Sequence, residues 1–195
     1  MTIEIKRLTP ERADDFFYFF ETDAHADNPN EEKCYCVNWV STNHDDETDF
    51  STPSKRKALA KLYIDECTLQ GYLAYENGKV VGWCNTNTKS KCVQCMGWKS
   101  YMSDIPTNQS QDDKMKSIYC FAIAPHMKRK GVASQLLETI SRDAKEEGFI
   151  GIEVFPLKTS KDEFMSFMGP IGLYEKHGFK IVGETERDYI MRKML

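Results

Sequence analysis

The sequence predicts a three-layer α/β (α+β) domain with a mixed central sheet. A strand–helix–strand pattern spans residues 117–155, and the two strands of such a unit pair in parallel with a right-handed connection. Residues 71–86 hold two strand-like runs around Asn77-Gly78, a dipeptide that accepts the positive φ angles of a tight hairpin turn. A parallel unit and an antiparallel hairpin within 195 residues indicate one mixed sheet covered by helices.

The first third of the chain is expected to contain a strand and two helices. Residues 2–8 alternate weakly and end before Pro10, which predicts a strand followed by a helix with Thr9 as its N-cap. The aromatic run at 16–20 is wide enough to be buried on most sides. Thr52-Pro53 begins a second helix. The apolar positions expected on its buried face are Leu59, Leu62, Tyr63 and Cys67.

The second half carries the more regular pattern. A buried strand over 117–124 ends at Pro125, a helix from about 131 to 147 ends at Gly148, and a strand follows over 150–155. The remaining elements are a short helix near 170–177 and strands near 179–185 and 188–194. Residues 23–50 and 87–114 are polar and irregular, and we interpret them as a loop or lid and an insertion within one domain covering 1–195.

Composition narrows the class of protein. Apolar residues make up 41% and charged residues 29%, which indicates a soluble globular chain. We find no apolar stretch of membrane-spanning length and no secretory leader, so we expect a cytoplasmic protein without a membrane partner. A net charge of −4 argues against nucleic-acid binding. The charge is uneven, because residues 11–50 hold twelve acids and two basic residues, a net −10 that leaves +6 elsewhere.

The junction after the strand at 117–124 carries the clearest chemical signal. Basic residues precede a helix that begins with small residues, and a helix N-terminus offers unpaired N–H groups and partial positive charge to an anion. Gly131 and Ala133 would let a phosphate approach the backbone, and Ser134 adds a hydroxyl donor. The pattern is neither a P-loop nor a dinucleotide fingerprint.

These residues resemble the pyrophosphate signature Q/R-x-x-G-x-G/A of the GNAT superfamily of N-acetyltransferases. Lys128-Arg-Lys-Gly131-Val-Ala133 matches it, with Lys in place of Gln or Arg at the first position. A second motif, Leu173-Tyr174-Glu-Lys-His177-Gly178-Phe179, is similar to the superfamily's "LYEKxGF" about forty residues downstream. The front end, Asp27-Asn-Pro followed by Cys34-Tyr-Cys36, together with Gly169-Pro170, is similar to a bacterial subgroup with a "DNP…CYC" start.

The resemblance implies a sheet with a splayed strand pair and direct transfer of an acetyl group from acetyl-CoA, as co-substrate, to an amine. The pantetheine arm would lie along one strand edge, and the pyrophosphate would lie on the loop that follows. The implied edge residues are Phe121, Ala122 and Ile123. The implied loop residues are Lys128, Arg129, Lys130, Gly131, Val132, Ala133 and Ser134.

Two residues are candidates for proton transfer. The motif places Tyr174 near the coenzyme sulfur, where a phenol can protonate the leaving thiolate, although the ring could also simply pack on its helix. Glu153, in the middle of a buried strand, is the candidate base, with a structural ion pair as the alternative. Asp23, Asp27 or a water chain could serve instead. The acidic 11–50 region would favour a cationic amine such as a polyamine, an aminoglycoside-like sugar or a peptide amine.

Other interpretations stay open at this point. The four thiols of Cys34, Cys36, Cys92 and Cys95 match structural zinc in number but not in spacing, so no metal is expected. Seven cysteines without a secretory leader favour free thiols. A module of the same fold that binds acyl-CoA without catalysis is the alternative to an enzyme. The resemblance makes a homodimer plausible.

Overall fold

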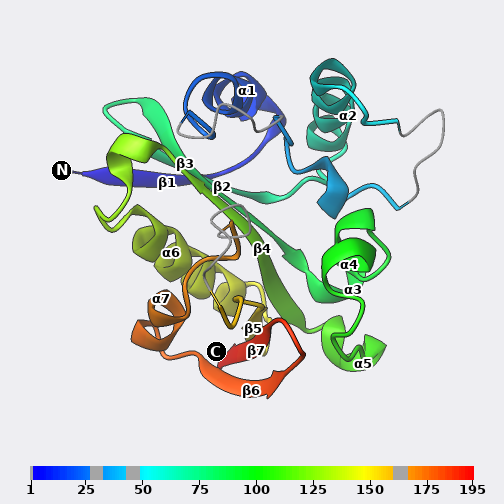
Figure 1. The fold of residues 1–195 in the computed structure, drawn as a ribbon. Coiled ribbons are helices and arrows are strands. Elements are labelled where there is room, and N and C mark those ends of the chain that lie inside the picture. The colour runs from blue at the N-terminus through cyan, green and yellow to red at the C-terminus, as the bar shows by residue number, and fades with distance from the viewer. Residues whose placement is uncertain (1, 27–32, 43–48, 160–166) are drawn as a thin grey trace.

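The computed structural model describes residues 2–26, 33–42, 49–159 and 167–195. Within these ranges the strands form one seven-stranded sheet in the order β1-β2-β3-β4-β5-β7-β6 (Figure 1). The strands are β1 (Ile3–Arg7), β2 (Gly71–Glu76), β3 (Lys79–Thr88), β4 (Met115–Ile123), β5 (Gly151–Val154), β6 (Lys180–Glu184) and β7 (Tyr189–Met194). Only β4 and β5 pair in parallel, which confirms the mixed sheet and the predicted strand–helix–strand unit.

Helices cover both faces of this sheet. The longer ones are α1 (Ala13–Thr22), α2 (Pro53–Asp65) and α6 (Val132–Glu146). Neighbouring residues on a strand point to opposite faces. A Cβ atom at Gly82 would come within 2.9 Å of Val132 on α6, whereas the next residue, Trp83, has its ring 5.0 Å from that of Phe16 on α1. Helices α1 and α6 therefore lie on opposite faces of the sheet.

Short helices fill the segment between β3 and β4, which the sequence analysis treated as irregular. They are α3 (Lys89–Cys92), α4 (Met96–Tyr101) and α5 (Gln109–Asp112). Helices α3 and α5 contact β4, so this insertion packs at the end of the sheet where β4 begins. Three further 3₁₀ turns, η1 (Pro10–Arg12), η2 (Val37–Trp39) and η3 (Pro125–Met127), and α7 (Ile171–Lys176) complete the described elements.

Strands β4 and β5 diverge soon after they meet. Their pairing covers Met115–Ser117 on β4 and ends where Ser117 lies opposite Glu153. Strand β4 continues to Ile123, whereas β5 ends at Val154. The described residues thus form the splayed strand pair that the resemblance implied, and we call the space between the diverging strands the fork.

One local expectation about the helices is wrong. Helix α2 does not bury the expected face: Leu62 is 48% exposed and Cys67 is exposed beyond the helix end, whereas Arg56, Ala60 and Ile64 are buried with Tyr63. The aromatic run of α1 is buried on most sides as expected, with Tyr18 exposed at 57%. Thr9 is the N-cap of η1 and Pro10 follows it as predicted, but the Thr9 hydroxyl accepts a hydrogen bond from the Arg12 guanidinium at 2.9 Å instead of one from a backbone amide.

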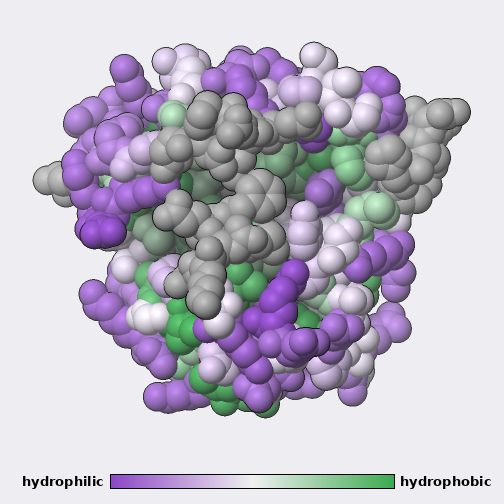
Figure 2. Space-filling model, viewed as in Figure 1, coloured by the Kyte–Doolittle hydropathy of each residue, from purple (hydrophilic) through white to green (hydrophobic). Residues whose placement is uncertain are grey.

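The surface is mainly hydrophilic on the face seen in Figure 2, with a hydrophobic area in the lower part of the view, where Figure 1 places β6 and β7. These strands carry the exposed apolar residues Ile181, Val182 and Met194. None of the helices among the described residues combines the length and the hydropathy that a bilayer crossing requires.

Candidate active site

The loop between β4 and α6 passes twice through the left-handed region. Arg129 and Gly131 adopt φ angles of +61° and +83°. Gly131 is the N-cap of α6, and the first helical hydrogen bond runs from the Gln135 amide to the Gly131 carbonyl at 3.1 Å. The amides of the first helical turn therefore have no intrahelical acceptor, as at any helix N-terminus.

The side chains of this loop leave the first turn open. A Cβ atom at Gly131 would meet no atom within 4 Å. Val132 is buried, with its side chain against Gly82, so only its backbone amide belongs to the open turn. The exposed basic side chains are Lys128, Arg129 and Lys130. Open amides, the positive end of a fifteen-residue helix and three cationic groups at one place fit a diphosphate.

The strand edge predicted for pantetheine leads directly into this loop. Phe121, Ala122 and Ile123 pair with β3 on one side, opposite Cys84, Trp83 and Gly82. On the other side they extend past the point where the β5 pairing stops, so they border the fork. The residues expected to hold the coenzyme therefore form one continuous stretch from the fork to α6, and their role in binding stays a prediction.

Tyr174 lies on α7 and is completely buried. Its hydroxyl donates a hydrogen bond to the Met168 carbonyl at 2.5 Å. A Cβ atom at Gly169 would lie 2.9 Å from this hydroxyl and 3.4 Å from the Phe121 ring, so a glycine here leaves room beside the strand edge. Burial raises the pKa of Tyr174 well above its usual value, and the nearby Cys84 adds to the effect. The phenol therefore keeps its proton, and its role as the acid stays a prediction.

Glu153 lies at the centre of a buried ionic cluster below the fork. Its Oε1 is 2.7 Å from Lys89 Nζ, and its Oε2 is 2.6 Å from Arg192 Nη2. Lys89 Nζ also lies 3.1 Å from Asp112 Oδ1 and donates to the Pro106 carbonyl at 3.3 Å. Both oxygens of Glu153 thus have cationic partners, and neither can accept an amine proton without giving up an ion pair. This is the structural alternative, and the geometry disfavours the base role.

The acidic region of residues 11–50 is partly neutralised by lysine side chains. Glu21 pairs with Lys57 at 2.6 Å, and Asp49 pairs with Lys55. Asp23, an alternative base, ends α1 and accepts a hydrogen bond from the Thr22 hydroxyl at 2.8 Å. The acids that lie outside the described residues are Asp27, Glu31, Glu32, Asp45, Asp46 and Glu47.

All seven cysteines are free thiols. Cys36 Sγ accepts a hydrogen bond from Trp83 Nε1 at 3.3 Å, and Cys95 Sγ donates to the Trp39 carbonyl at 3.2 Å. Among the described residues no three His, Cys, Asp or Glu side chains gather in a way that could hold a metal ion. Cys92 Sγ also donates to the Trp39 carbonyl at 3.6 Å, and the partly buried Cys34 Sγ lies 3.8 Å from His25 Nε2.

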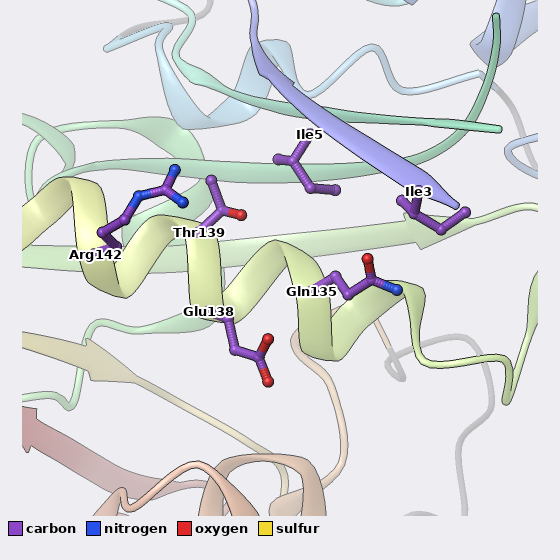
Figure 3. Close-up of a pocket in the computed structure, with 6 residues that line it drawn as sticks. All are labelled: Ile3, Ile5, Gln135, Glu138, Thr139 and Arg142. Atoms are coloured by element: carbon purple, nitrogen blue, oxygen red, sulfur yellow. The ribbon is translucent and has the colours of Figure 1, made fainter. Parts of the chain in front are cut away.

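A separate hollow of about 490 Å³ lies between β1 and α6. Ile3 and Ile5 project toward α6 from β1, while Glu138 points away from that strand (Figure 3). Gln135, Thr139 and Arg142 complete the lining. No residue of β4 or β5 takes part, so this hollow is distinct from the fork.

Sequence patterns alone missed the groups that surround the fork on the α1 side. Lys89 and Asp112 come from opposite ends of the segment 87–114, which the sequence predicts to be an irregular insertion, and Arg192 comes from the strand predicted near 188–194. Tyr119 was hidden within an apolar strand run. A lysine that begins a helix directly after a strand, as Lys89 does, was the single local signal, and many solvated lysines share it.

Comparison with known proteins agrees with this geometry. A sequence profile of the acetyltransferase (GNAT) family matches residues 39–179. No curated protein matches the chain. A PaiA N-acetyltransferase from Thermoplasma acidophilum in complex with coenzyme A has 16% identity and a TM-score of 0.56, with all of both chains covered.

Two further solved structures share the fold. A GNAT-family acetyltransferase from Streptococcus pneumoniae has 16% identity and a TM-score of 0.58 over all of both chains. The ribosomal-protein-S18-alanine N-acetyltransferase from Escherichia coli has 15% identity and a TM-score of 0.51, with 99% of this chain and 94% of that chain covered. At these identities the structures show the fold alone. The family match covers most of the sequence, and the chain belongs to the GNAT family of acetyltransferases.

Proposed function

We propose that the protein transfers an acetyl group from acetyl-CoA directly to a primary amine, the acceptor being a cationic small molecule or a peptide amine. The observation that carries the proposal is the open, cationic first turn of α6 next to the fork. Bound acetyl-CoA would supply an acetyl thioester, which an amine attacks at its carbonyl carbon. The chain's own residues would hold the diphosphate and orient the acyl end. They would also remove a proton from the amine and supply one to the leaving sulfur.

The loop and the strand edge would bind different parts of the coenzyme. The amides from Gly131 to Ser134 would donate hydrogen bonds to the diphosphate, and Lys128, Arg129 and Lys130 would balance its charge. The edge of β4 at Phe121–Ile123 would offer backbone groups to the amide-containing arm of the coenzyme. Because β5 ends at Val154, that edge is not covered by a neighbouring described strand.

Tyr174 would supply the proton that the leaving sulfur needs. Its hydroxyl is neutral and buried, and it lies beside Gly169 and the Phe121 edge. To act as an acid, it would exchange its hydrogen bond with the Met168 carbonyl for one with sulfur. The amine proton would leave through a group other than Glu153, whose oxygens are held by Lys89 and Arg192.

A thiol-release screen tests this function. Acetyl-CoA is offered with a panel of polyamines, aminoglycosides, amino acids and peptides, and free coenzyme A is measured with a thiol reagent. We expect release that depends on one class of amine, together with calorimetric binding of coenzyme A. Binding without release for any amine would replace the enzyme by an acyl-CoA-binding module. Absence of coenzyme A binding would refute both readings.

A further inference from the structure

Tyr119 occupies a β-bulge at the vertex of the fork. On β3, the consecutive residues Asn85 and Thr86 lie opposite Cys120 and Ile118 of β4. Tyr119 is therefore an extra residue without a register partner, the arrangement that defines a bulge. The bulge follows directly after Ser117, where β5 pairing ends. Such bulges redirect side chains and often lie next to active sites.

The ring of Tyr119 is fixed while its hydroxyl is not satisfied. The ring is fully buried, stacks on Trp39 at a centroid distance of 4.9 Å and meets Trp98 edge-on at 6.4 Å. Neither its hydroxyl nor the buried Ser117 hydroxyl makes a hydrogen bond of good geometry with a described residue. The Ser117 hydroxyl and the Cys92 thiol nonetheless lie close enough to the Tyr119 hydroxyl to influence its pKa. Leaving a buried polar group unpaired costs about 1–3 kcal/mol. Two such hydroxyls on one strand are unusual in a core whose side chains serve only to stabilise the fold.

These hydroxyls lie on the face of the sheet opposite the coenzyme loop. Tyr119 stacks on Trp39 in η2, and the neighbouring Cys36 binds Trp83, which packs against α1. Ser117 is two residues before Tyr119 and shares its face. The coenzyme loop begins α6 on the other face. Tyr119 and Ser117 would therefore lie across the sheet from an acyl group that entered the fork from the α6 side.

The surroundings of the two hydroxyls are electrically balanced. The cluster of Lys89, Arg192, Glu153 and Asp112 contributes two positive and two negative charges. Burial raises the pKa of Tyr119 well above its usual value, so its hydroxyl stays neutral. Neutral hydroxyls among aromatic rings favour an uncharged amine, which is the form that can attack a carbonyl, over a desolvated ammonium ion.

We infer that Tyr119 and Ser117 form the acceptor subsite, with their hydroxyl oxygens accepting hydrogen bonds from the uncharged primary amine and orienting it toward the fork. This inference rests on the proposed function and adds its acceptor-binding residues. Tyr119 is then a catalytic residue that contacts the substrate, and the Trp39 and Trp98 rings position it.

The test compares wild type with Tyr119→Phe and Ser117→Ala. Phenylalanine keeps the stacked ring and removes only the hydroxyl. Tyr75→Phe is the matched control, because Tyr75 is also buried on a strand, but its hydroxyl donates to Asp15 at 2.8 Å on α1. Three quantities are measured for each protein. They are steady-state kinetics with the best amine of the panel, calorimetric binding of spermidine and n-butylamine to the enzyme saturated with coenzyme A, and unfolding by urea.

We expect Tyr119→Phe and Ser117→Ala to lower kcat/KM for the amine about tenfold or more, with the KM for acetyl-CoA within about twofold of wild type. Tyr119→Phe should also weaken amine binding in the complex without lowering stability, because it removes an unpaired hydroxyl. Tyr75→Phe should lower stability and leave the kinetics unchanged.

The outcomes separate the two proposals. Wild-type turnover with unchanged amine kinetics in Tyr119→Phe overturns the acceptor subsite alone. So does a loss of stability in Tyr119→Phe as large as in the control, accompanied by equal changes in both KM values. Amine binding that weakens in Tyr119→Phe, without turnover in any protein, overturns the acetyltransferase function and supports the subsite. Failure of both amines to bind the wild-type complex and of every panel amine to react overturns both.

Discussion

Arg129 offers a direct test of the coenzyme loop, because its backbone and its charge can be changed separately. It is an exposed, non-glycine residue at φ +61°. Arg129→Gly relieves the left-handed backbone and removes the charge, Arg129→Ala removes only the charge, and Arg129→Lys keeps both. Comparing the three variants isolates each contribution.

The magnitudes follow from these two features. A left-handed conformation costs a residue with a Cβ atom about 1–2 kcal/mol, and glycine gives back about 0.5–1 kcal/mol through its larger unfolded-state entropy. We therefore expect Arg129→Gly to be about 0.5–1 kcal/mol more stable than Arg129→Ala. An exposed charge near a diphosphate contributes about 0.5–1 kcal/mol, so both variants should bind coenzyme A about two- to fivefold more weakly.

Urea unfolding and calorimetry with coenzyme A measure the two effects. Calorimetry is repeated at high salt, where screening should shrink the difference in affinity between wild type and Arg129→Ala. Equal stability of the Gly and Ala variants would refute the strained backbone. An unchanged affinity for coenzyme A in Arg129→Ala at low salt would refute a phosphate site at this loop.

Three further predictions concern two buried groups and one partly buried carboxylate. Tyr174→Phe should lower kcat at least tenfold while acetyl-CoA affinity stays within about twofold, and unchanged turnover would exclude the acid role. Glu153→Gln should destabilise the fold by about 3–5 kcal/mol in urea unfolding, and adding Arg192→Met should recover part of that loss; a strictly additive double variant would contradict the ionic cluster. Burial opposes ionisation of Asp143, but the hydrogen bond from Arg7 and its other partners outweigh it, so its pKa lies below the ordinary 3.8. Its stabilisation is therefore complete above that value and lost as the pH falls through the lowered pKa, so the unfolding difference between wild type and Asp143→Asn should begin to shrink below about pH 4 and vanish only below the lowered pKa.

Local signals were sufficient for most of the fold. Asn77 and Gly78 adopt φ angles of +50° and +78° in the β2–β3 turn, and Gly148 adopts +84° where α6 ends. These features could be predicted because each depends on the backbone freedom of only one or two residues. The loop proposed to bind the coenzyme could be predicted for the same reason. Its charges, its small residues and its helix N-terminus are contiguous in the sequence.

Helix α2 shows where periodicity fails. Its buried face includes Arg56, whose guanidinium donates to the carbonyls of Lys33 at 2.6 Å and Phe50 at 2.8 Å. The helix thus packs against loop backbone as well as apolar side chains, and a buried arginine there satisfies acceptors that no spacing of leucines reveals. Leu62 is 48% exposed on the same helix.

The side-chain partners at the fork could not be predicted from the sequence because they depend on long-range register. Whether Tyr119 is a bulge residue is decided by its offset against Asn85 and Thr86, more than thirty residues earlier in the sequence. Likewise, Glu153 becomes an ion-pair partner only when the insertion brings Lys89 to β5. A carboxylate within an apolar strand has the same sequence signature whether it serves as a base or as a buried counterion.

The two sides of the fork differ in the arrangement of their charges. On the α6 side, exposed lysines and arginine meet solvent, where they can attract a polyanion from a distance. On the α1 side, Glu21 and Asp49 are paired with lysines, and the ionic cluster below Tyr119 is balanced. The acidic residues on the α1 side could still attract an ammonium ion from solution. The ionic cluster below Tyr119 has no net negative charge, however, so it would not keep the amine protonated. Attraction of a cationic amine at the surface is thus compatible with uptake of the uncharged amine at the fork. The amine would lose its proton on the way from the surface to the fork.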